Sequence, residues 1–366
     1  MKINLAMYIF FKQRGVGLIE LMISMLIGLF IMAGVLQLFS TSSQNAVANA
    51  GVSRIQENIR YTFSRLADDI GQTGNLGCVS LSSNKINNKQ FMNNMLDLTA
   101  VADSGDAYDF STIINGVDSA TATTKPADQI AVGTDTYRIR YVDHGFRIPL
   151  ITRSAHTESV KIDFNHVDFP RLEQYQVVAV TDCDKGAIFM ITNVPNTATG
   201  EIKHEAGVTA PEDKINEGLK NASVDKQGIF TSSVGTSTIT SPAYLYGGNT
   251  GAYQYFIGTS AKANAAGEAC DRVNEPQHCA LFRRKNADNQ EIAEGVHDMQ
   301  VTYGWTDTAG TLRFATANNV TDWTVIDRVN IELSFNSIDN AVFSANNPTA
   351  LITKTVSKTF NLSNQL

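Results

Sequence analysis

Residues 16–39 read VGLIELMISMLIGLFIMAGVLQLF, and this run carries a single charged side chain, that of Glu20. As an α-helix rising 1.5 Å per residue, it spans roughly 36 Å, enough to cross the hydrocarbon core of a bilayer. The residues before it are basic, with Lys12 and Arg14 and no acidic residue ahead of Gly15. By the positive-inside rule, we expect the N-terminus to stay in the cytoplasm and the bulk of the chain to be exported.

The junction between the basic flank and the apolar run distinguishes this segment from a secretory signal. The run is longer than the apolar region of such a signal, and no small-x-small cleavage site closes it cleanly, so we expect it to be retained. Gly15 separates Arg14 from the run. A cut after Gly15 would give Val16 a new, positively charged α-amine and make Glu20 the fifth residue of the mature chain.

Glu20 lies inside the membrane-spanning run, where a carboxylate costs roughly 3 kcal/mol on insertion scales. An acid in this position indicates a function and needs a partner. The α-amine of Val16 in a neighbouring subunit would relieve the charge and set the stagger between subunits. The alternative is a signal anchor that tolerates one Glu.

The stretch RGVGLIELMISMLIG, residues 14–28, resembles the leader and N-terminal helix of type IV prepilins and of type II secretion pseudopilins. Val16 replaces the aromatic residue or Met that is usual in this family, and Gly17 replaces the usual Thr. Residues 18–21, LIEL, fit the family pattern. The resemblance implies a leader over 1–15, cleavage after Gly15 and N-methylation of Val16 by the prepilin peptidase. Whether translation starts at Met1 or at Met7 stays open.

An amphipathic helix is predicted to continue from the apolar run. Residues 40–70 are polar overall, with apolar positions spaced 3, 4, 4, 3 and 4 apart, which form one stripe of a helix. We expect a single helix from about Val16 to Ile70, ended by Gly71 and Gly74, with 16–39 in the membrane or filament core and 40–74 docking on a head. Local bending and close helix contacts explain Gly28 and Gly34 equally well. The stripe consists of Val52, Ile55, Ile59, Phe63, Leu66 and Ile70.

Beyond Gly74 the composition shifts to Asn, Thr, Ser, Gly and Asp with short strand-like runs, so we predict an α+β protein with an antiparallel, β-rich head over 75–366. Long polar stretches at 84–94, 103–128 and 195–240 are predicted surface loops. Strands are predicted at 129–142, 176–181, 187–194, 252–257, 280–284, 299–305, 325–335 and 353–362.

Three interior segments narrow the resemblance to PilW-type minor pilins. They are VVAVTDCDKGAIF (177–189), LFRR (281–284) and IAEGVHDMQVTYG (292–304). In that family a similar segment precedes the last strands, and the chain ends in a strand like the one predicted at 355–362. The resemblance therefore implies a type IV pilin-like fold.

Composition argues against several other classes of protein. The net charge is −7, and the 29 basic residues form no run, so we expect no nucleic acid as a partner. No P-loop, GxSxG, HExxH or EF-hand pattern occurs. The Asp103–Asp109 loop could hold calcium but lacks the full spacing, and a solvated turn is favoured. His204 and the pair Asp143-His144 stand isolated. We expect no enzyme activity, cofactor or metal.

Four cysteines occur, at Cys78, Cys183, Cys270 and Cys279. The even count and the absence of CxxC favour disulfides in an oxidising compartment over a zinc site, with four reduced thiols as the alternative. A disulfide across the short loop between Cys270 and Cys279 would leave Cys78 to bridge Cys183. This is one of three connectivities, and the choice stays open.

Resemblance to PilW-type proteins implies a minor pilin that primes pilus polymerisation and sits at the pilus tip. Its partners would be other minor pilins, the major pilin, the prepilin peptidase, the inner-membrane assembly platform and a tip adhesin. The chain would cross the inner membrane once, with its head in the periplasm, before it joins the filament at the cell surface. The alternatives are a type II secretion pseudopilin, a membrane-anchored periplasmic enzyme and a DNA-uptake receptor with a basic patch.

Overall fold

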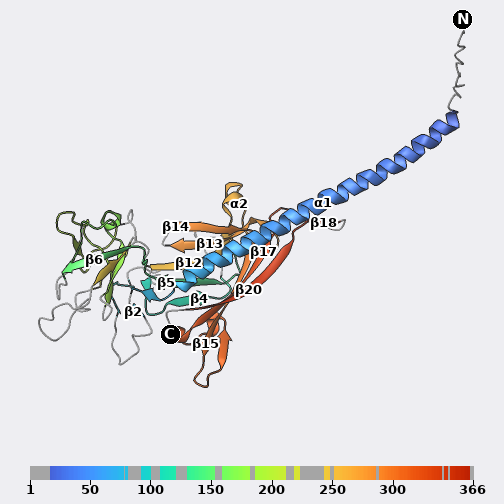
Figure 1. Cartoon of the computed structure of the whole chain (residues 1–366). Coiled ribbons are helices and arrows are strands. Elements are labelled where there is room, and N and C mark those ends of the chain that lie inside the picture. Colours follow the sequence, from blue (N-terminus) through green and yellow to red (C-terminus); the bar gives the residue numbers. More distant parts are fainter. Residues whose placement is uncertain are drawn as a thin grey trace, which may run out of the picture.

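The computed structural model combines one long helix with three sheets of four to seven strands (Figure 1). It describes residues 17–77, 79–80, 92–99, 108–120, 130–152, 159–181, 186–211, 218–222, 243–247, 251–285, 288–339, 342–344 and 347–362. The predicted α+β layout, a long apolar N-terminal helix followed by a β-rich region, is confirmed.

Helix α1, Leu18–Gly71, is continuous over 54 residues, roughly 80 Å at the standard rise. The predicted single helix is thus present, and its last residue lies one position beyond the predicted end. The N–H of Thr73 bonds to the Ile70 carbonyl, and Gly74 follows with a φ of 76°, a left-handed conformation that stops the helix.

Two antiparallel sheets pack on the second half of α1. The five-stranded sheet has the order β14-β13-β12-β5-β4, and the four-stranded sheet has the order β16-β15-β17-β20. Their strands are β4 Ile114–Val117, β5 Thr136–Tyr141, β12 Gly251–Thr259, β13 Cys279–Lys285 and β14 Asp288–Glu294 in the first, and β15 Val296–Thr306, β16 Leu312–Ala315, β17 Arg328–Asn336 and β20 Thr353–Asn361 in the second.

The chain passes from one sheet to the other at Gly295, between β14 and β15. This residue has a φ of 76°, and a Cβ added there would lie 2.9 Å from the Asn336 carbonyl oxygen. A side chain would therefore collide with backbone, and only glycine fits this turn.

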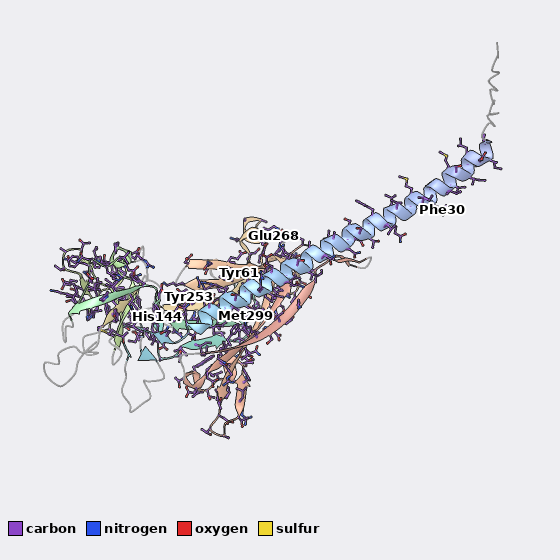
Figure 2. All side chains as sticks on the ribbon, in the orientation of Figure 1. Phe30, Tyr61, His144, Tyr253, Glu268 and Met299 are labelled. Carbon is purple, nitrogen blue, oxygen red and sulfur yellow. A yellow bond between two sulfur atoms is a disulfide. The ribbon has the colours of Figure 1, made fainter. Side chains whose placement is uncertain are left out.

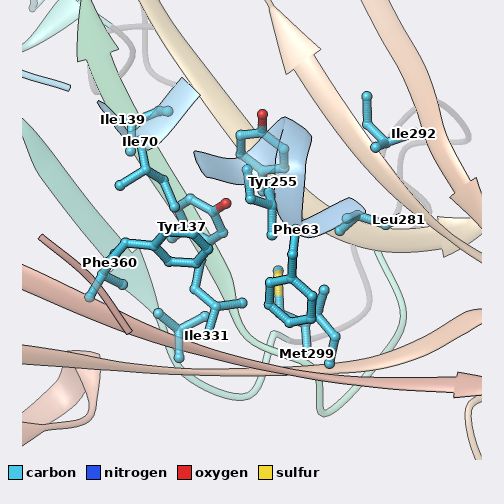
Figure 3. Packing of buried hydrophobic residues seen from close by; sticks show 14 of the residues in the cluster. Phe63, Ile70, Tyr137, Ile139, Tyr255, Leu281, Ile292, Met299, Ile331 and Phe360 are labelled. Carbon is cyan, nitrogen blue, oxygen red and sulfur yellow. The ribbon is translucent and has the colours of Figure 1, made fainter. Parts of the chain in front are cut away.

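The core lies where the apolar stripe of α1 meets both sheets. The ring of Phe63 lies 6.4 Å from that of Phe335 and 6.3 Å from that of Phe360. Figure 3 shows Phe63 and Ile70 of the helix among side chains of the two sheets. Each such side chain, fully buried, contributes about 1.5–3 kcal/mol, so packing rather than helix propensity fixes this half of α1.

A third, seven-stranded sheet lies at the end of the molecule away from the free end of α1 (Figure 1). Its order is β10-β7-β6-β11-β8-β9-β3, and its apolar clusters are separate from the core on α1. Its strands are β3 Met92–Asn94, β6 Arg147–Thr152, β7 Ser159–Ile162, β8 Val177–Thr181, β9 Gly186–Met190, β10 Glu201–Lys203 and β11 Tyr244–Tyr246.

Small elements complete the described structure. The pairs β1–β2 and β18–β19 are short hairpins, and helix α2 follows β12 with Ser260 as its N-cap. Among the described strand pairs, β3–β9 alone is parallel. The bounds are β1 Asn75–Leu76, β2 Val79–Ser80, α2 Ala261–Ala265, β18 Val342–Ser344 and β19 Asn347–Ala350.

Several predicted strand boundaries differ from the structure. Within the described part of the predicted strand 129–142, which begins at 130, only Thr136–Tyr141 is a strand, because a turn at Gly133, with a φ of 79°, breaks the run. Strand β17 begins at Arg328 rather than at 325, because Asp322 caps a 3-10 turn over Trp323–Val325. The predicted loops 84–94, 103–128 and 195–240 contain the short strands β3, β4 and β10, respectively.

Candidate assembly surface

The first half of α1 makes no contact that buries it. Every described residue from Leu18 to Phe39 is exposed, with 81% of Leu18 and 75% of Phe30 open to solvent. Figure 2 shows Phe30 on the part of the helix that extends beyond the head. By length and composition α1 can cross a membrane. An apolar cylinder of this size is stable only in a bilayer or against other apolar helices.

Glu20 lies in the first turn of this exposed half. Its backbone N–H and that of Leu21 both bond to the Gly17 carbonyl, at 3.0 and 3.2 Å, so the helix is formed at this point. The Ser24 hydroxyl donates to the Glu20 carbonyl at 2.7 Å. The Glu20 carboxylate is exposed in the isolated chain and suits the positive end of the helix dipole.

The glycines of the apolar half leave open space on its surface. A Cβ added at Gly28 or Gly34 would meet nothing within 4 Å, and α1 passes through both without interruption. Gly15 and Val16, the predicted processing residues, lie outside the described residues.

A buried carboxylate fastens the end of α1 to the five-stranded sheet. The Asp69 side chain is 3% exposed, and Arg283 of β13 donates to it at 2.9 Å. The hydroxyl of Tyr255 also donates to Asp69, as does that of Tyr141 at 3.3 Å. A buried charge with a cation and two further donors is fully compensated. We call these four residues the Asp69 cluster.

Burial keeps the phenols of this region protonated. Burial, with the charge of Asp69, raises the pKa of both Tyr141 and Tyr255 well above the ordinary value of about 10. Burial likewise raises the pKa of Tyr253, whose ring stacks on Tyr141 at 5.0 Å, to about 12. The hydroxyl groups of Tyr141 and Tyr255 are therefore donors to Asp69 throughout the physiological range.

Sequence reasoning missed the Asp69 cluster. Asp69 occupies the buried side of the helix, three residues after Leu66, where an acid is unexpected. An acid on the apolar side of the helix was the sequence signal that could have indicated a buried ion pair. Its partners in the five-stranded sheet could not be identified from the sequence, because they lie 72 to 214 residues away along the chain.

Cys270 and Cys279 form a disulfide. It closes the connection between β12 and β13, where Thr259 and Cys279 are paired. Asn336 at the end of β17 donates to the Pro276 carbonyl in this loop at 2.8 Å. The disulfide therefore ties the loop to β13 of the five-stranded sheet, and the Asn336 bond ties it to β17 of the four-stranded sheet. Cys78 and Cys183 lie outside the described residues.

The remaining sequence candidates do not come together as a site. His204 is buried with its ring 4.8 Å from that of Phe189, and His144 lies against Tyr246 at 5.3 Å. Asp109 accepts from the backbone N–H of Ser111, whereas 103–107 are outside the described residues. Among the residues that the structure describes, no group of three His, Cys, Asp or Glu side chains could hold a metal.

Two segments match known families. Residues 10–36 match the prokaryotic N-terminal methylation motif, and residues 254–363 match the family described as type IV pilus-assembly protein W. The first covers the basic flank and much of the apolar half of α1, and the second runs from β12 through β20. The resemblance to PilW-type minor pilins is thereby confirmed. No curated protein and no solved structure matches the chain.

Proposed function

We propose that this chain takes part in priming pilus assembly and then occupies the pilus tip. The two segments that match known families support its assignment as a minor pilin of the type IV pilus. One observation carries the proposal: an exposed apolar half-helix with an acid in its first turn is joined, without a break, to a half-helix embedded in a folded head. The first half supplies the assembly surface, and the second half transmits load to the head.

Glu20 would guide assembly by charge pairing. Cleavage after Gly15 would place the α-amine of Val16 one helical turn before Glu20. In a staggered bundle, the amine of one subunit could reach the carboxylate of another, and the low dielectric around the apolar helices would strengthen that pairing. A subunit in the wrong register would leave both charges buried and unpaired, which costs several kcal/mol.

The Asp69 cluster supports a mechanical role for the head. Tension on α1 would act along the helix, and Asp69 anchors its last turn to β5, β12 and β13 through Tyr141, Tyr255 and Arg283. The Cys270–Cys279 disulfide adds a covalent closure to the same sheet.

The partners and location follow from this role. Before assembly the chain would lie in the inner membrane with its head in the periplasm, and its partners would be the prepilin peptidase, the assembly platform, other minor pilins and the major pilin. A tip adhesin would dock on the exposed head. We expect no nucleic acid partner and no enzyme activity, since the family segments are those of a structural subunit.

Replacement of Glu20 tests the proposal. Glu20→Ala should reduce incorporation of the chain into sheared pili and lower the number of pili per cell, whereas Glu57→Ala, which removes an exposed acid farther along the same helix, should change neither. Unchanged incorporation of Glu20→Ala would contradict the role assigned to this residue.

Deletion of the gene separates a pilus from a secretion filament. Loss of surface pili and of twitching would support the minor pilin. Intact pili with failed release of exported proteins would instead identify a type II secretion pseudopilin.

A further inference from the structure

The four-stranded sheet has an outer face that α1 does not cover. Residues alternate between the two faces of a strand, and Phe360 of β20 points inward to Phe63 of the helix. Thr355, Ser357 and Thr359, which alternate with the inward-pointing residues, are all exposed on the outer face. This face therefore stays accessible when α1 is occupied by a membrane or by neighbouring helices.

An aromatic ring packs over a glycine on this face. Phe314 of β16 is directly opposite Gly304 of β15, and a Cβ added at Gly304 would lie 2.7 Å from Phe314 Cε1 and 2.5 Å from Arg328 Cγ. The ring and the arginine stem thus fill the space above the glycine. Covering a strand glycine explains the buried side of the ring. In addition, 43% of Phe314 is open to solvent, so part of the ring can contact a ligand.

Fixed polar groups lie beside the exposed ring. Arg328 donates to both carboxylate oxygens of Asp327, from Nε at 2.6 Å and from Nη2 at 3.1 Å. Thr306 donates to the same carboxylate at 3.4 Å. Asp327 and Arg328 are each about a quarter exposed, with 23% and 27% of the side chain open. They present acceptor and donor groups in a fixed plane, and their charges cancel.

The polar surface continues across the sheet. Asn330 is paired with Thr359 on β20, and Ser357 donates to the Asn330 side-chain oxygen at 2.6 Å. This bond fixes the amide and leaves its N–H groups as the part that can donate to a ligand. From β16 to β20 the surface spans three strand spacings, about 14 Å. We call Phe314, Thr306, Asp327, Arg328, Asn330 and Thr359 the Phe314 platform.

This combination fits a neutral sugar chain. A sugar ring has an apolar face of C–H groups, which stacks on an aromatic ring, and a rim of hydroxyl groups, which need paired donors and acceptors. The charges of the platform cancel, and Glu332 adds an exposed carboxylate on the same face. An acidic polymer would be repelled by that carboxylate and by the net charge of −7.

We propose that the Phe314 platform binds neutral hexose or N-acetylhexosamine units of a polysaccharide. The surface extends about 14 Å across three strand spacings, which is longer than one sugar ring, so it suits a polymer rather than a single sugar. This proposal stands on the geometry of the four-stranded sheet and does not depend on the role proposed for Glu20.

Titration with neutral oligosaccharides tests the proposal. The full chain is kept in lauryldimethylamine oxide, a detergent without a sugar headgroup that would compete for the site. Maltohexaose, cellohexaose and chitohexaose are then titrated by calorimetry. We expect saturable binding of at least one, and a loss of affinity of about tenfold in Phe314→Ala. Phe314→Trp should retain binding, and Tyr61→Ala, which removes a 55% exposed ring on α1, should not change it.

Two further variants keep the test decisive if Phe314→Ala fails to fold. Phe314→Leu keeps an apolar cover over Gly304 but removes the flat ring, and Thr359→Glu adds a charge to the platform without altering Phe314. Both should weaken binding while circular dichroism is unchanged. Failure of all three hexasaccharides to bind would overturn the proposal. The proposal would also be overturned if both variants bound with unchanged affinity, or if an acidic hexasaccharide bound more tightly than the neutral ones. A Phe314→Ala variant that loses binding to a protein partner but keeps binding to the hexasaccharides would overturn it as well.

Discussion

Removal of the Asp69 carboxylate should detach the end of α1 from the five-stranded sheet. Asp69→Ala leaves the buried hydroxyl groups of Tyr141 and Tyr255 without this acceptor and removes the carboxylate beside Arg283. Breaking a buried ion pair by removing one partner costs about 3–5 kcal/mol. Arg283 keeps a bond to Gln290 at 2.7 Å, so we expect the lower end, about 3 kcal/mol. Asp69→Asn, which keeps one acceptor oxygen, should cost about 1–2 kcal/mol.

Urea unfolding measures this cost. A chain beginning at Ser40 keeps every buried residue of α1, the first of which is Ile55. The two tryptophans, Trp305 and Trp323, lie in or beside the four-stranded sheet, and Trp323 packs edge-on against Tyr303 at 4.7 Å, so their fluorescence reports the part of the head that packs on the helix. With a slope of about 3 kcal/mol/M, Asp69→Ala should lower the midpoint by about 1 M.

The matched control is the adjacent acid. Asp68 is exposed on the same turn of α1, so Asp68→Ala should stay within about 0.5 kcal/mol of the wild type. Equal midpoints for Asp69→Ala and Asp68→Ala would refute the anchoring role of the Asp69 cluster.

Two further predictions concern the closure beside β13. Replacing both Cys270 and Cys279 by alanine should lower the free energy of unfolding by about 2–3 kcal/mol, because the unfolded chain regains the freedom of a short loop. A urea midpoint that neither the double substitution nor reduction changes would speak against a stabilising role of the disulfide. The Nδ1 of His297 lies 3.3 Å from the Asn336 amide, and burial lowers the pKa of this imidazole. The stability that neutral His297 contributes is therefore fully present above pH about 6.5, the ordinary pKa of histidine. This stability declines as the pH falls toward the pKa of His297 in the folded protein. His297→Gln should flatten that decline between about pH 7 and 5 in the same urea assay, and an unaltered slope would contradict the assignment.

The helix could be predicted from the sequence because its information is local. The stripe from Val52 to Ile70 and the glycines after it fix both the helical period and the end of α1. The strands β8, β12, β13, β15 and β20 were also found, since each is a run rich in apolar, β-branched or aromatic residues. Strand β6 escaped prediction because Pro149 interrupts it, and β14, DNQEIAE, because its composition is polar.

The arrangement of the sheets could not be predicted, because it rests on pairings between distant segments. Tyr141 and Gly251 are neighbours across β5 and β12, and the strands β6 to β11 lie between them in the sequence. The Phe314 platform was missed for the same reason: Gly304, Phe314 and Arg328 form a surface only through the register of three strands.

The mature N-terminus is the most direct test of the central claim, that this chain is a processed filament subunit. Mass spectrometry of the protein from its native membrane should show a chain that begins at N-methylated Val16. A chain that still begins at Met1 or Met7, in cells with an active prepilin peptidase, would contradict the account and favour an uncleaved membrane-anchored protein.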